Sequence, residues 1–99
     1  MKITTCTALL CALTTAPAFA QDKAAMCGDQ AEMVMQVVAA RQSGVAAVKA
    51  EQLVVDALDA DTSAYAGVVP AVVAWVYTLP EDQLGDAVGE SWSAACLAQ

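Results

Sequence analysis

The chain has 99 residues, 59% of them hydrophobic, and its eleven acidic and four basic residues give a formal net charge of −7 at pH 7. An acidic surface repels phosphate backbones and anionic headgroups, which excludes nucleic-acid binding as a main function. The chain has no histidine, so a serine or cysteine nucleophile would lack its usual base. We therefore expect no catalytic residues, no cofactor and no enzyme activity.

The first twenty residues have the three parts of a cleavable signal peptide. Met1 and Lys2 form a short positive start, an uncharged stretch follows over 3–15, and small residues stand at Ala18 and Ala20. This order predicts export and cleavage after residue 20. The apolar stretch of roughly 13 residues is too short to span a hydrocarbon core of about 30 Å. The sequence thus predicts a leader over 1–20 and a helical domain over 21–99 in the periplasm or outside the cell.

Two amphipathic helices are expected first in the exported domain. Apolar residues recur at three-four spacing between about Asp22 and Gln42, and Gly44 supplies a helix stop. A second, shorter pattern covers Ala46 to Leu58. Both patterns are typical of helices with one buried face.

The third segment, Ala64 to Leu79, is apolar on every side and contains Pro70, which should kink or split a helix. Two alternatives compete. A membrane span over 62–80 would place Cys27 and Cys96 on opposite sides of the bilayer, and a β-strand would lack a second strand of similar composition as partner. We expect a helix, and no stable membrane insertion.

The fourth helix is expected to begin near Pro80. Thr78 and Glu81 have the spacing of a capping box, and proline suits a first helical turn. The apolar stripe of this helix includes Leu84 and Val88. Four short helical segments predict an all-α fold, a small four-helix bundle.

Two cysteines remain after the predicted cleavage, Cys27 and Cys96, near opposite ends of the domain. An even pair in a short exported domain predicts a disulfide. Closing so long a loop stabilises a fold by roughly 4 kcal/mol in the chain-entropy model. The bundle is therefore expected to be closed by one disulfide.

The sequence raises two kinds of binding site, a protein-partner surface and a metal site. A helix that is apolar all round is hard to cover in so small a bundle, which predicts a surface for a protein partner or a homodimer. Its residues are Val68, Val72, Trp75, Val76 and Tyr77. For metals, Met26, Met33 and Met35 near Cys27 offer soft ligands for Cu(I), although methionine on an apolar face is usually core filler. We expect no metal site, and soft-metal binding through these methionines is a second alternative function.

Four sequence features carry a resemblance: Cys27, the Arg-x-x-Gly of Arg41 to Gly44, the Val-Tyr-x-x-Pro of 76–80, and Cys96. The layout resembles small helical proteins exported by proteobacteria and implies no activity. Acid-stress chaperones of the HdeA type look similar in size, export and single disulfide, but differ in helix order and charge. The leading hypothesis is a non-catalytic periplasmic interaction module. The alternative is a chaperone loosened by protonation of carboxylates below pH ~4.

Overall fold

The computed structural model describes residues 18–99, so most of the predicted leader lies outside it. Within this range the chain forms four α-helices and two short 3-10 turns, and it forms no strand. In chain order they are α1 (Ala18–Gln42), α2 (Ala47–Ala57), η1 (Ser63–Val68), α3 (Val69–Val76), η2 (Glu81–Gln83) and α4 (Asp86–Leu97). The all-α prediction is confirmed. The predicted leader boundary at residue 20 falls in the first turn of α1.

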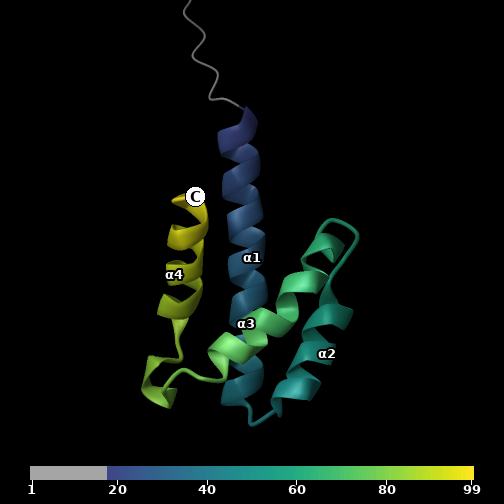
Figure 1. Cartoon of the computed structure of the whole chain (residues 1–99), viewed down its shortest axis with the longest axis vertical. Coiled ribbons are helices and arrows are strands. Elements are labelled where there is room, and N and C mark those ends of the chain that lie inside the picture. The colour runs from purple at the N-terminus through teal and green to yellow at the C-terminus, as the bar shows by residue number, and fades with distance from the viewer. Residues whose placement is uncertain (1–17) are drawn as a thin grey trace, which may run out of the picture.

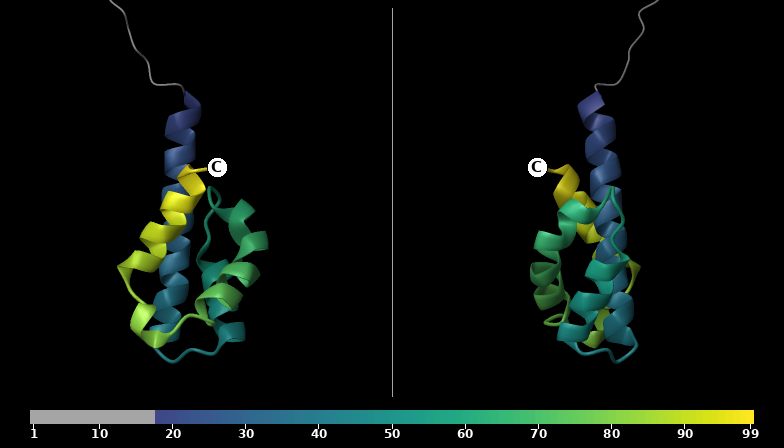
Figure 2. Two further views of the ribbon diagram at one scale, coloured as in Figure 1. Left: turned by 60° about the vertical axis from the view of Figure 1, so that its left-hand side comes forward. Right: turned by 90° about the vertical axis from the view of Figure 1, so that its right-hand side faces the viewer.

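The long helix α1 is the element around which the others pack (Figure 1). α4 runs antiparallel along one side of it, α2 lies on the other side, and α3 crosses in front of α1 and α2. α3 packs directly against α1, and Figure 2 shows that no helix of the described residues covers the opposite face of α1. Gly44, at φ +78°, makes the tight turn from α1 to α2 that was predicted to stop the first helix.

The core is built mainly from valine, with contributions from all four helices. Four valines of α3 at spacings of three and four residues face inward, and the opposite face of this helix carries small residues that remain exposed. Because α3 is only eight residues long, α1 and α2 suffice to cover its apolar stripe. The buried cluster comprises Met33, Val34, Val37, Val38, Val54, Val69, Val72, Val73, Val76 and Val88.

The third segment splits at its proline, as predicted. Ser63–Val68 forms a 3-10 turn, and Pro70 stands in the first turn of α3, where its missing N–H costs no helical hydrogen bond. No helix within the part of the chain that is described here combines the length and hydropathy needed to cross a bilayer.

The predicted start of the fourth helix is wrong. Thr78 does not cap a helix ahead of it, because its hydroxyl donates backward to the carbonyl of Trp75 at 2.6 Å. The chain then makes one 3-10 turn, and α4 begins only at Asp86. In between, Leu84 packs against the core, and the side-chain amide of Gln42 donates to its carbonyl at 3.1 Å. These two contacts link the α3–α4 connection to the core and to α1 just before α4 begins.

The predicted disulfide is confirmed. Cys27 and Cys96, 69 positions apart, are joined with an S–S distance of 2.02 Å and a Cα–Cα distance of 5.6 Å. Cys27 is fully buried on α1. The bond fixes the end of α4 against the first half of α1.

A second tie joins the far end of α1 to the end of α3. The guanidinium of Arg41 donates to the carbonyl of Val76 and lies 5.9 Å from the centroid of the Tyr77 ring. The Tyr77 hydroxyl in turn donates to the carbonyl of Val45. The Arg-x-x-Gly and Val-Tyr-x-x-Pro motifs therefore meet in space, and their shared role in this chain is to hold the fold together.

Candidate interaction site

The partner surface predicted on the third segment is largely taken up by the fold. Val72 and Val76 are 1% and 0% exposed, so they belong to the core and the prediction does not hold for them. Val68, in the 3-10 turn before α3, is 40% exposed. α3 is half as long as the helix predicted over 64–79, so its neighbours can cover most of its apolar surface.

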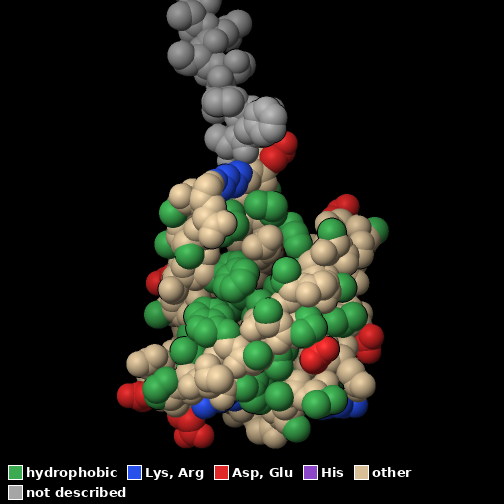
Figure 3. All heavy atoms as spheres, in the orientation of Figure 1, with side chains coloured by type: hydrophobic (Ala, Val, Ile, Leu, Met, Phe, Trp, Pro, Cys, Tyr) green, Lys and Arg blue, Asp and Glu red, His purple; other side chains and the backbone are tan. Residues whose placement is uncertain are grey.

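The two aromatic residues of that predicted surface are half-buried and bonded within the molecule. Tyr77 belongs to the tie described above. Trp75 packs against Trp92 of α4, with ring centroids 5.8 Å apart, and the indole N–H of Trp92 donates to the side-chain oxygen of Gln30 at 3.1 Å. Figure 3 shows hydrophobic side chains gathered on this side of the molecule, between α4, α1 and α3. An aromatic cleft of about 480 Å³ remains there, lined on α4 by Ser91 among others.

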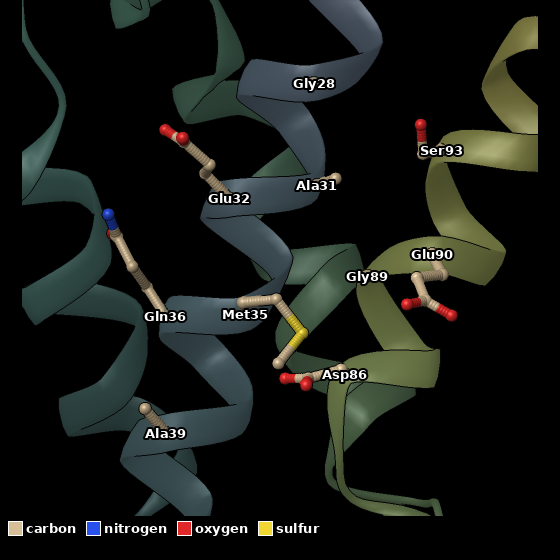
Figure 4. Close-up of a pocket in the computed structure, with 10 residues that line it drawn as sticks. All are labelled: Gly28, Ala31, Glu32, Met35, Gln36, Ala39, Asp86, Gly89, Glu90 and Ser93. Carbon is tan, nitrogen blue, oxygen red and sulfur yellow. The ribbon is translucent and has the colours of Figure 1, made fainter.

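A larger groove, of about 630 Å³, lies between α1 and α4 on the other side of the molecule. Figure 4 views it with α4 to the right of α1, the reverse of Figure 1, which places the groove on the face away from α3. Its floor consists of glycine, alanine and one methionine. They are Gly28, Ala31, Met35 and Ala39 of α1 and Gly89 of α4.

Gly89 is a point of close contact between the two helices. A β-carbon at this position would lie 2.8 Å from Cγ and 2.9 Å from Sδ of Met35, and 3.4 Å from the carbonyl oxygen of Ala31. Glycine therefore lets Met35 rest directly on the backbone of α4 and form the centre of the groove floor (Figure 4). The residues around Gly89 in the sequence do not indicate this role, because the helix that it contacts is far away in the chain.

Acidic side chains border the groove on both helices. Glu32 of α1 and Asp86 and Glu90 of α4 are all exposed, and Gln36 and Ser93 complete the rim. In Figure 4 the carboxylate of Asp86 lies near the end of the Met35 side chain, that of Glu90 stands farther away on α4, and that of Glu32 extends from α1 away from α4. None of the ten lining residues is basic. The groove thus combines an apolar floor with a negative rim.

The structure places the three methionines in different surroundings. Met33 is 2% exposed in the core, Met35 lies in the groove, and Met26 is 39% exposed beside Trp92. Cys27, the thiol that would complete a soft-metal site, is in the disulfide. Across residues 22–99 no group of three or more histidine, cysteine or acidic side chains has the geometry to hold a metal ion.

The acidic residues between α2 and η1 build a turn. One carboxylate oxygen of Asp59 accepts hydrogen bonds from the backbone N–H of Asp61 at 2.9 Å, and from the N–H and the hydroxyl of Thr62, both at 3.0 Å. These bonds, the Thr62 hydroxyl first, lower the pKa of Asp59 below its ordinary value of 3.8. The structure gives this cluster a local role in the chain reversal.

Among residues 22–99 no polar or charged side chain is buried. In comparisons with known proteins, no family model, curated protein or solved structure matches the chain. The open groove between α1 and α4, with its apolar floor and acidic rim, is the candidate interaction site.

Proposed function

We propose that the chain is a non-catalytic helical interaction module of the periplasm that holds a protein partner in the groove between α1 and α4. The observation that carries this proposal is the groove itself, an apolar floor of small residues left open on the two helices that the disulfide joins. A disulfide persists in oxidising compartments, which supports a location outside the cytoplasm.

The dimensions of the groove suit a helix. Its floor on α1 extends from Gly28 to Ala39, a distance of about 17 Å at 1.5 Å per residue, or three helical turns. Small residues along the floor allow a third helix to approach to the usual interaxial distance of about 8–10 Å. Laying the apolar face of a helix into such a groove is a common mode of recognition.

The acid-responsive alternative has less support. Loosening by acid requires carboxylates that are buried or tightly paired in the native state. Within residues 22–99 no charged side chain is buried, and the disulfide ties α4 to α1 at any pH. Protonation would change the surface charge of this bundle more than its packing.

Site-specific photocrosslinking tests the proposal with a matched pair of positions. Ser93 lines the groove, and Ser91, two residues earlier on α4, lines the aromatic cleft instead. A photoreactive p-benzoylphenylalanine at Ser93 in the exported protein should give a discrete adduct in intact cells, and the same group at Ser91 should not. Adducts from Ser91 alone, or from neither position, would refute the groove as the interaction surface.

A further inference from the structure

We infer that the groove takes a basic amphipathic helix, a segment of another protein with small apolar residues along one face and lysine or arginine along its edges. This inference rests on the proposed function and specifies the chemistry of the partner. It follows from three features of the described residues. They are the negative charge of the rim, the small apolar residues of the floor, and the like charges that a two-fold dimer through this face would bring together.

The rim fixes the charge of the partner. Glu32 stands on the α1 side, and Asp86 and Glu90 stand on the α4 side, so an apolar ligand in the groove has carboxylates along both of its edges. The field around the groove is reinforced by the whole domain, which carries eleven acidic and three basic residues beyond the predicted leader. Such a field draws in cationic segments and disfavours acidic ones.

The floor fixes the face that the partner presents. The lining residues of α1 follow one another at three-four spacing, as Gly28, Ala31 or Glu32, Met35 and Ala39. This is the spacing of a helical ridge. Methionine adapts its unbranched side chain to different partners, a property that other helix-binding surfaces use. A partner face of alanine and leucine matches this floor in depth and polarity.

A second copy of this chain fits the groove poorly. A two-fold dimer formed through this face would set the same patch against itself, so that Glu32, Asp86 and Glu90 of one copy would meet those of the other. Like charges opposed across an interface are destabilising. The observations therefore favour a partner of opposite charge over self-association.

The probe for the test is a fluorescein-labelled synthetic peptide of about 18 residues, roughly 27 Å long as a helix, with alanine and leucine on one face and lysine on both edges. A shuffled peptide of the same composition controls for charge alone. A peptide with glutamate in place of lysine controls for the apolar face alone. Binding to the exported, disulfide-bonded protein is followed by fluorescence anisotropy at two salt concentrations.

Two protein variants with the same loss of charge locate the binding. Glu32→Gln/Glu90→Gln removes two carboxylates from the rim, whereas Glu51→Gln/Asp56→Asn removes two from α2, outside the groove. The rim variant should weaken the Kd about fivefold, within the roughly two- to thirty-fold range for two exposed ion pairs. The α2 variant should change it less than twofold, because salt screens distant charges.

The inference is supported if the amphipathic lysine peptide binds, the shuffled and glutamate peptides do not, and only the rim variant weakens binding. Equal binding of the shuffled or glutamate peptide, equal loss in both variants, or no binding of the lysine peptide overturns it. A concentration-dependent dimer in analytical ultracentrifugation that the rim variant strengthens also overturns it, in favour of a second copy. Crosslinks from Ser93 without peptide binding leave the proposed function standing and reject only the basic partner.

Discussion

Removing the disulfide is the perturbation whose size the structure defines best. The double variant Cys27→Ala/Cys96→Ala opens a bond between positions 69 apart. The chain-entropy model assigns such a loop about 15 cal/mol/K, or about 4 kcal/mol at 25 °C. Small domains unfold with about 5–15 kcal/mol in total, so the variant should lose a large share of its stability and roughly 20 °C in Tm.

The two tryptophans provide the assay. Trp92 lies on α4 and packs against Trp75 of α3, so urea unfolding followed by fluorescence reports whether α4 is docked. We expect the midpoint to fall sharply in the variant, and reduction of the natural protein to produce the same shift. A free energy of unfolding within about 1 kcal/mol of the parent would refute the reasoning, because it would mean that the packing of α4 on α1 needs no covalent tie.

Three further predictions concern single residues. Gly28→Ala should stabilise α1 by about 1 kcal/mol, because nothing lies within 4 Å of the new β-carbon. Gly89→Ala should not give this gain, because its β-carbon would force Met35 to move. Urea unfolding measures both variants. Tyr77→Phe should destabilise the fold by about 1 kcal/mol in the same assay, since its hydroxyl donates to a backbone carbonyl. Asp59 has a lowered pKa, so the turn that it holds should be stable above pH 3.8 and should loosen as the pH falls further. Amide hydrogen exchange in this turn measures the change.

Each of these predictions has a definite contrary result. Equal stabilisation by the two glycine substitutions would mean that α1 and α4 are farther apart than described. An unchanged midpoint for Tyr77→Phe would remove the hydroxyl from the tie between α1 and α3. Protection factors in the 59–62 turn that stay the same between pH 5 and pH 2, and that match those of Asp59→Asn, would show that the carboxylate does not hold the turn.

Local sequence signals predicted the helices whose ends are set locally. Gly44 stops α1 because a left-handed turn is needed there, and Pro70 divides the third segment because an internal proline breaks the helical bonding. The start of α4 is different. Thr78 and Glu81 have the spacing of a capping box, yet the Thr78 hydroxyl bonds backward to Trp75, and the segment before α4 contacts Gln42, which is far away in sequence. Such a contact cannot be deduced from local patterns.

The candidate site was only partly within reach of the sequence. The predicted surface on the third segment included two valines that the fold buries, because the helix is shorter than its apolar run. The groove had a usable signal in the cysteine pair. If Cys27 and Cys96 join antiparallel helices, equal steps along both place Gly89 opposite residue 34, next to Met35. Counting residues from the disulfide in this way predicts that Gly89 contacts α1.

The proposed binding of partners in the groove between α1 and α4 can be tested directly through the NMR signals of three methionines. Met35 lies in the groove, Met33 in the core and Met26 on the exposed side near Trp92. In NMR spectra of the exported protein with 13C-methyl methionine, added lysine peptide should shift the Met35 signal and leave the other two in place. A shift confined to Met26, or no shift of Met35 at saturation, would contradict the account.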